Sequence, residues 1–266
     1  MAASWARSNS LLCVGLDPDL AKLLEAIRNG NNPLFEFNRA IIDSTADIVS
    51  VYKPNSAFYE ALGSEGIEQL KMTADYLREK YSDIPIILDA KRADIGNTNN
   101  GYASFIFDYL GMDGVTLHPY LGREALEPFL SYKDKGIIIL CRTSNPGAGE
   151  FQDLLVDGKP LYQHVAKQVS EKWDKNNNCL LVVGATYPEE MKIIREIVGP
   201  DMAFLVPGIG AQGGNVEAVM KAGLDNKQGL IISSSRDVLY ASGGEDFAKA
   251  ARKKATTTRD EINKYR

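Results

Sequence analysis

Four ionisable residues stand close together in the segment Asp89-Ala90-Lys91-Arg92-Ala93-Asp94, directly after the apolar residues 86–88. So short an apolar run predicts a buried parallel strand rather than a helix. Asp89 and Lys91 are two residues apart, so their side chains share one side wherever extended structure persists. An ammonium held by a carboxylate in a pocket can stabilise negative charge that develops during a reaction. The alternative is a surface ion pair, which contributes little.

Short apolar runs alternate with helical patterns along all 266 residues. This alternation predicts an α/β fold with parallel strands. Eight strands in a chain of this length suit a (β/α)8 TIM barrel, and we expect one catalytic domain over residues 1–266. A doubly wound open sheet is the alternative. The expected strands are residues 11–16, 49–52, 84–88, 114–117, 136–141, 180–184, 204–206 and 230–232, and the clearest helices are residues 35–49, 67–81, 188–198 and 247–265.

Polar residues gather directly after these apolar runs. In a barrel, the carboxyl ends of all strands meet at one mouth, where active sites lie. Scattered surface charges would have no preference for strand ends, so this distribution favours an enzyme. The residues concerned are Asp17, Lys53, Asp89, Lys91, Ser144, Pro207, Ser235 and Arg236.

The glycine-rich residues 207–214 follow the seventh expected strand. A dinucleotide fingerprint would carry an acid about 20 residues later, whereas Glu217 and Asp225 come sooner. In barrels, the loops after the seventh and eighth strands often bind phosphate, and glycines let backbone N–H groups approach its oxygens. Arg236, after the eighth strand, offers a planar fork for two oxygens. The segment therefore predicts a phosphate site, with a merely flexible loop as the alternative.

The string Asp-x-Lys-Arg-x-x-Asp-Ile-Gly at residues 89–96 resembles the signature of the orotidine 5′-phosphate decarboxylase family. The segment Pro-Gly-Ile-Gly-Ala-Gln-Gly-Gly at residues 207–214 supports the resemblance, and Tyr-Lys-Pro-Asn at residues 52–55 looks like the longer bacterial-type subgroup. The resemblance implies decarboxylation of orotidine 5′-monophosphate to uridine 5′-monophosphate without metal or cofactor. Lys91 would stabilise the carbanion and donate the proton. It implies Lys53, Asp89, Lys91 and Asp94 as catalytic residues, and Asp17, Lys53, Ile95, Thr98, Ser144, Pro207, Gln212, Ser235 and Arg236 as substrate-binding residues.

Asp94, Ile95 and Thr98 lie further along the chain, where it should already be leaving the barrel mouth to start a helix. Reaching their own pocket would be geometrically awkward. The resemblance implies that they are lent to a neighbouring subunit, in a homodimer with shared active sites. It also suggests that Asn55 faces the site, whereas His118 is expected to be structural or peripheral.

Composition narrows the possible partners and surroundings. The net charge of −5 gives no reason to expect nucleic acid or an anionic membrane as a partner. Cys13, Cys141 and Cys179 are odd in number and lie in apolar runs, which suits free thiols in a reducing cytoplasm. Two rival functions stay open: a Mg²⁺-dependent sugar-phosphate decarboxylase or aldolase on the same barrel, and a non-catalytic barrel that binds nucleotide phosphate.

Overall fold

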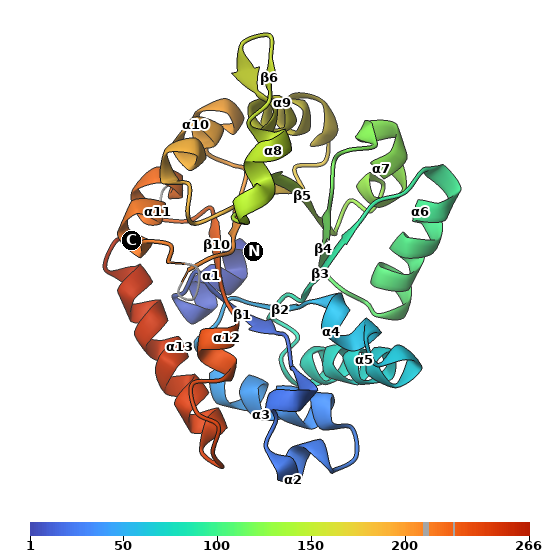
Figure 1. Ribbon diagram of the computed structural model, residues 1–266, viewed down its shortest axis with the longest axis vertical. Helices are drawn as coiled ribbons and strands as arrows, with labels where there is room; N and C mark the ends of the chain where they lie inside the picture. Colours follow the sequence, from blue (N-terminus) through green and yellow to red (C-terminus); the bar gives the residue numbers. More distant parts are fainter. Residues whose placement is uncertain (210–212, 226) are drawn as a thin grey trace.

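The computed structural model describes residues 1–209, 213–225 and 227–266, and its strands form a barrel at the centre of the molecule (Figure 1). Within these residues, eight parallel strands pair in the order β2-β1-β10-β9-β8-β5-β4-β3. The predicted (β/α)8 barrel is therefore confirmed. The strands are β1 (Leu12–Leu16), β2 (Val51–Pro54), β3 (Ile87–Arg92), β4 (Gly114–Leu117), β5 (Gly136–Arg142), β8 (Cys179–Val183), β9 (Phe204–Val206) and β10 (Leu230–Ser234).

The barrel closes where β2 and β3, the two strands at the ends of this pairing order, meet. Tyr52 pairs with Ile86, and Asn55 pairs with Asp89, in isolated bridges rather than a continuous ladder. The backbone N–H of Tyr52 also donates to the carbonyl of Pro85 at 3.1 Å. This closure rules out the open doubly wound sheet. It also places the end of β2 beside Asp89.

The strands are apolar because both of their faces are covered, by the barrel interior on one side and by helices on the other. Every residue of β1 and β8 is buried. One continuous cluster of buried side chains joins the strands and the inner helix faces. Its largest fully buried members include Tyr52, Tyr59, Phe129 and Phe204.

Helices surround the barrel, and the four clearest sequence patterns lie in helices close to their expected bounds. In α10, Pro188 fits the first turn, Glu189 and Glu190 favour the positive end of the helix dipole, and Gly199 with φ 75° ends the helix. No helix of the described residues is long and apolar enough to cross a membrane. The main helices are α3 (Pro33–Thr45), α5 (Gly63–Lys80), α6 (Gly96–Ala103), α7 (Gly122–Leu130), α9 (Leu161–Gln168), α10 (Pro188–Val198), α11 (Val216–Gly223) and α13 (Phe247–Asn263); the shorter helical segments are η1 (Leu20–Lys22), α2 (Glu25–Arg28), α4 (Ser56–Glu60), η2 (Ser104–Tyr109), η3 (Pro146–Ala148), η4 (Val169–Trp173) and α12 (Arg236–Leu239).

A short helix that the sequence patterns do not predict, α1 (Ala2–Ser8), packs at the amino end of the barrel. Its Trp5 side chain is buried in the core. The Ser4 hydroxyl donates to the carbonyl of Ser50, just before β2, at 2.6 Å. The Arg7 guanidinium donates to the carbonyl of Val49 at 2.8 Å. The amino end is thereby covered, while the carboxyl end stays open.

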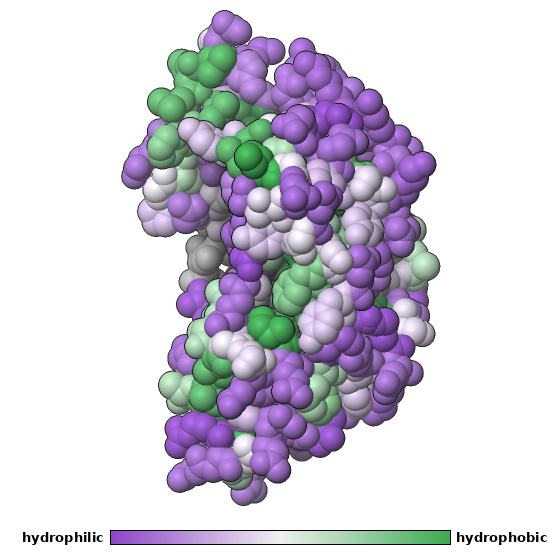
Figure 2. All heavy atoms as spheres, turned by 90° about the vertical axis from the view of Figure 1, so that its right-hand side faces the viewer, coloured by the Kyte–Doolittle hydropathy of each residue, from purple (hydrophilic) through white to green (hydrophobic). Residues whose placement is uncertain are grey.

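A second unpredicted segment lies between β5 and α9. It consists of the one-turn helix α8 (Gly149–Gln152) and an antiparallel hairpin of β6 (Leu155–Val156) and β7 (Lys159–Pro160). The hairpin projects from the top of the molecule in Figure 1. Four large apolar side chains of α8, β6 and the residues between them are exposed, namely Phe151, Leu154, Leu155 and Val156. In Figure 2 a hydrophobic patch covers this upper projecting part of the molecule.

Candidate active site

A pocket of about 540 Å³ opens at the carboxyl ends of the strands. Its walls come from strands β2, β3, β4, β5, β8, β9 and β10 and from the segments that follow β1, β2, β5, β9 and β10. Pockets of this size suit small-molecule ligands. Eight residues singled out from the sequence line it: Asp17, Lys53, Asp89, Lys91, Ser144, Pro207, Ser235 and Arg236.

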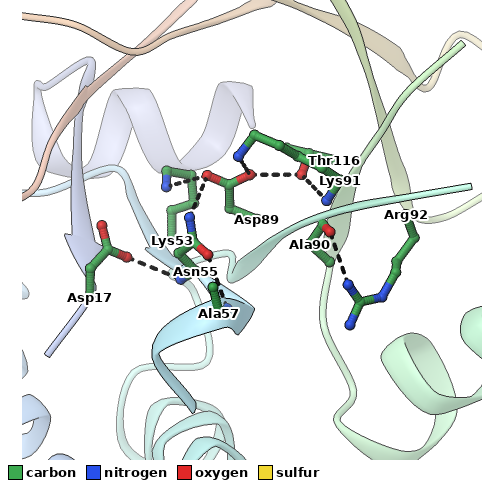
Figure 3. A network of polar contacts seen from close by, with 9 residues as sticks. All are labelled: Asp17, Lys53, Asn55, Ala57, Asp89, Ala90, Lys91, Arg92 and Thr116. Carbon is green, nitrogen blue, oxygen red and sulfur yellow. Dashed lines mark hydrogen bonds and ion pairs between the residues drawn. The ribbon is translucent and has the colours of Figure 1, made fainter. Parts of the chain in front are cut away.

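The centre of the polar network is the carboxylate of Asp89 (Figure 3). Its Oδ2 atom accepts from Lys53 Nζ at 3.0 Å, and its Oδ1 atom accepts from Lys91 Nζ at 2.7 Å. The Thr116 hydroxyl donates to the same Oδ1 atom at 2.8 Å. Asp17 joins from β1, because its Oδ1 atom accepts the backbone N–H of Asn55 at 3.0 Å. The arrangement is an alternating row of ammonium, carboxylate and ammonium.

Mutual attraction keeps this row ionised despite its burial. Desolvation alone would lower the pKa of Lys53, but the Asp89 and Asp17 carboxylates outweigh it and raise that pKa well above its ordinary value. Desolvation would likewise raise the pKa of Asp89, yet the charges and hydrogen bonds of Lys53 and Lys91 lower it strongly. The pair is therefore charged throughout the neutral range.

The backbone at Lys91 departs from a regular strand. Lys91 has φ 46°, in the left-handed region that residues with a side chain seldom adopt. The register of β3 against β4 shifts between Leu88 and Arg92, which is a β-bulge. Bulges re-aim side chains and are common beside active sites. The expectation that Asp89 and Lys91 reach one pocket is confirmed, but a bulge rather than an uninterrupted strand directs Lys91.

The segments that follow β9 and β10 bring the expected phosphate residues to the same pocket. Pro207, Gly208, Ser235 and Arg236 line it together. Gly208 has φ 102°, a conformation that favours glycine. A side chain at Gly15 would collide with the Ser235 hydroxyl, since an added Cβ would lie 1.8 Å from it. The predicted Gln212 lies outside the described residues.

Asp94, Ile95 and Thr98 do not line the pocket of their own chain. Ile95 is 62 % exposed. The fully buried Asn99 holds the backbone here: its Oδ1 atom accepts the N–H of Asp94 at 2.9 Å, and its Nδ2 atom donates to the carbonyls of Asp94 and Ala125. The motif is therefore divided, with Asp89 and Lys91 inside the pocket and the next three predicted residues outside it.

Sequence reasoning missed several residues of the pocket. Thr116 is the most informative, because it is the one polar residue in the apolar strand β4, and that position was the available signal. The α8 segment brings in Gln152, whose Oε1 atom accepts the N–H of Thr143 at 2.9 Å. His118 is half-buried and does not line the pocket. The further lining residues that were not predicted as site residues include Phe58, Thr143, Asn145, Gln152 and Asp237.

The described part of the chain contains neither a cluster of metal ligands nor a reactive thiolate. Within it, no group of three or more His, Cys, Asp or Glu side chains could hold a metal ion. All three cysteines are unpaired and buried. Burial raises the pKa of Cys13 and of Cys141 to about 12, so these thiols stay protonated at neutral pH.

Comparisons with known proteins agree with this geometry. The model of the orotidine 5′-phosphate decarboxylase / HUMPS family matches residues 10–253. The chain is 53% identical over 263 residues to an orotidine 5′-phosphate decarboxylase of Cellvibrio japonicus, covering 98% of this chain and 95% of that protein. It is 49% identical over 266 residues to one from a Janthinobacterium species, covering 100% of this chain and 97% of that protein.

Solved structures give the same result. The fold superimposes on the orotidine monophosphate decarboxylase of Leishmania donovani with a TM-score of 0.85 and 36% identity, covering 99% of this chain and 97% of that one. A putative decarboxylase of Toxoplasma gondii gives a TM-score of 0.89 and 37% identity, covering 99% and 94%. The chain therefore belongs to the orotidine 5′-phosphate decarboxylase family and resembles its longer bacterial members along its full length.

Proposed function

We propose that this protein is a carboxy-lyase that converts orotidine 5′-monophosphate to uridine 5′-monophosphate. The observation that carries the proposal is the alternating row of Lys53, Asp89 and Lys91 in a pocket that Arg236 also lines, directly after β10. A nucleoside monophosphate carries a base and a phosphate, which can meet these two groups of residues. Its base would lie against the charged row and its phosphate against the arginine.

Lys91 is the group placed to meet the reacting carbon. When the carbon–carbon bond breaks, CO2 leaves and the electron pair stays on the pyrimidine carbon. The Lys91 ammonium stabilises that carbanion and then gives it a proton, and solvent later returns a proton to Lys91. Half of the Lys91 side chain is exposed to the pocket, which supports this role. Enzymes lower barriers by roughly 8–23 kcal/mol, and preorganised charge is usually the largest contribution.

The remaining pocket residues bind and orient the nucleotide. Lys53 balances Asp89 and contacts the ribose, beside Asp17 from the neighbouring strand. Ser144 contacts the ribose or the pyrimidine. Pro207 and Gln212 belong to the loop that closes over the phosphate, and Arg236 holds the phosphate with the backbone N–H of Ser235. Binding energy from the phosphate can then serve the chemical step at the far end of the substrate.

A homodimer would complete the site. Asp94, Ile95 and Thr98 stand outside their own pocket, so we assign them to the pocket of a second copy. Exposed apolar side chains support a contact on this side of the barrel, because they lie on the loops after β3, β4 and β5. They are Ile95, Tyr120, Leu121, Phe151, Leu154, Leu155 and Val156.

The test is the loss of orotidine monophosphate absorbance with purified protein. We expect turnover that EDTA leaves unchanged, because the reaction drawn above uses only side chains. Activity that disappears with EDTA and returns with Mg²⁺ would favour the enediolate enzymes of this barrel. Tight nucleotide binding without turnover would favour the non-catalytic rival.

The cellular setting is also a proposal. Three buried, unpaired thiols suit a reducing compartment, so we place the protein in the cytoplasm. Its net charge of −5 makes nucleic acid and anionic membranes poor partners.

A further inference from the structure

We propose that Thr116 is a positioning residue that locks the Asp89 carboxylate to the main chain of Lys91. The inference rests on the proposed decarboxylation and adds a residue to its machinery. Thr116 lies on β4, is only 1 % exposed, and stands beside the Asp89 carboxylate and Lys91 (Figure 3). It would act through Asp89 and Lys91 rather than by touching the reacting carbon.

The β-bulge explains why a side chain is needed at this place. Leu88 pairs with Val115 and Arg92 pairs with Leu117, so the three residues between Leu88 and Arg92 face Thr116 alone. The left-handed Lys91 cannot continue the regular ladder. Its backbone N–H instead donates to the Thr116 Oγ1 atom at 3.0 Å. The side chain of Thr116 thus replaces a ladder partner and supports a backbone conformation that costs free energy.

The direction of the Thr116 hydroxyl follows from this contact. A backbone N–H can only donate, so Thr116 Oγ1 must accept from Lys91 and is free to donate its own proton elsewhere. It donates to Asp89 Oδ1 at 2.8 Å. The Lys91 ammonium donates to the same oxygen at 2.7 Å. A closed ring therefore runs from the Lys91 backbone through Thr116 and Asp89 to the Lys91 side chain.

This ring separates two tasks at Asp89 Oδ1. The Lys91 ammonium is half exposed, and it must turn toward the substrate and lose its proton. The Thr116 hydroxyl is buried and takes no part in proton transfer. It can keep the carboxylate in place while the ammonium reacts, so that the next proton returns Lys91 to the same position.

Two matched pairs of variants isolate the hydroxyl. Thr116→Val keeps the shape and removes the hydroxyl, whereas Thr116→Ser keeps the hydroxyl. Losing one hydrogen bond to a charged group predicts that Thr116→Val lowers kcat by about 10- to 100-fold with KM within about threefold. Thr116→Ser should stay within about threefold of wild type. If Thr116→Val does not fold, comparing Thr116→Ala with Thr116→Ser gives the same contrast.

The control is Thr73→Val, which removes another buried hydroxyl with two hydrogen bonds, at a residue that does not line the pocket. It should lower thermal stability but leave kcat unchanged.

Equal losses of kcat in the valine and serine variants would overturn the proposal, as would a valine variant with wild-type kcat. Either result requires an active wild-type enzyme. A wild-type protein that does not consume orotidine monophosphate would instead refute the proposed function.

Discussion

At the scale of single residues, the two lysines of the pocket carry the same charge in different surroundings. The Lys53 side chain is 6% exposed and the Lys91 side chain is 51% exposed, although both contact Asp89. A buried ammonium that is held by carboxylates cannot readily move or exchange its proton. An exposed one can do both. The geometry thus distinguishes a group that holds Asp89 from a group that reacts.

Lys91→Ala should lower kcat by about a thousandfold or more while the protein stays folded, because no other ammonium of the described residues reaches the same point of the pocket. Steady-state kinetics together with a thermal melt check this. The melting temperature should stay close to that of wild type, since half of the Lys91 side chain is exposed. A variant that keeps about a tenth of wild-type kcat would remove Lys91 from the reaction.

Arg236→Ala should weaken kcat/KM for the nucleotide much more than for the nucleoside that lacks the phosphate, since only the former offers an anion to the guanidinium. Phosphite added with the truncated nucleoside should partly restore turnover by the wild-type enzyme. Steady-state assays with both substrates measure the difference. If the wild type processed the truncated nucleoside as fast as the nucleotide, phosphate binding would not assist the chemical step.

The residues that the sequence predicts best are those with charge at a strand end. Asp17, Lys53, Asp89, Lys91 and Arg236 all line the pocket. Thr116 was missed because a threonine in an apolar strand has no charge to mark it. Gln152 was missed because a long, irregular connection brings it to the pocket. The spacing of residues along the chain does not predict the position of either side chain.

At the scale of elements, the site lies at the weakest part of the barrel wall. β2 and β3 meet only through isolated bridges, and one of these joins Asn55 to Asp89. The bulge in β3 adjoins the same place. Side chains also join the two strands here, as in the contact between Lys53 and Asp89.

The alternation of apolar runs with helical patterns explains which elements could be predicted from the sequence. All eight barrel strands overlap their predicted ranges, because a strand covered on both faces must be apolar throughout. The hairpin β6–β7 could not be recognised, because its two-residue strands carry no periodicity and its apolar side chains are exposed. Helix α1 is too short for its pattern to stand out.

Hydrogen bonds between Asp43 on α3 and residues at the carboxyl end of α5 should make the free energy of unfolding depend on pH. The Asp43 carboxylate accepts from the Tyr76 hydroxyl at 2.6 Å, the Lys80 ammonium at 2.9 Å and the Tyr81 hydroxyl at 2.7 Å. Burial disfavours the charged form, but these hydrogen bonds outweigh it and lower the pKa of Asp43. Folding is therefore favoured above the pKa of an unfolded aspartate, about 3.9. This contribution is lost as the pH falls through the lowered value.

Asp43→Asn should therefore lower the melting temperature by about 2 °C at pH 7. The expected shift is small because Asp43 and its partners are partly exposed, so that solvent screens their interaction. The difference from wild type should shrink as the pH falls from about 4 through the lowered pKa of folded Asp43, because the wild-type carboxylate becomes protonated over that range. Thermal melts across this pH range measure it, with the exposed Asp201→Asn as the control. A difference that is the same at all pH values would exclude the charge of Asp43 as its source.

At the scale of the whole molecule, the chain presents a divided motif. Asp89 and Lys91 line the pocket, whereas Asp94, Ile95 and Thr98 lie beyond it on a backbone that Asn99 fixes. A buried side chain that holds the loop at three points argues against a large rearrangement that would bring Asp94 back into its own pocket. A second copy can supply the missing carboxylate without any such movement. In a twofold dimer, each subunit would give and receive the same residues.

Mixing two inactive variants tests this arrangement. In a dimer of Lys91→Ala subunits, and in one of Asp94→Ala subunits, both sites lack one group. In a mixed dimer, both lesions fall in one site and the other site is intact. Random pairing gives half mixed dimers with one good site each, so refolding the two variants together should restore up to about a quarter of wild-type activity.

The matched control pairs Lys91→Ala with Asp89→Asn, two lesions in the pocket of the same subunit. Every site of that mixed dimer carries one lesion, so we expect no recovery. Subunit exchange is followed separately, with one variant carrying a distinguishable tag. If the mixture of Lys91→Ala and Asp94→Ala stays inactive although its subunits exchange, then Asp94 serves its own subunit. The Asn99-held loop would then have to move toward its own pocket during the reaction, and the division of the motif would describe only the free enzyme.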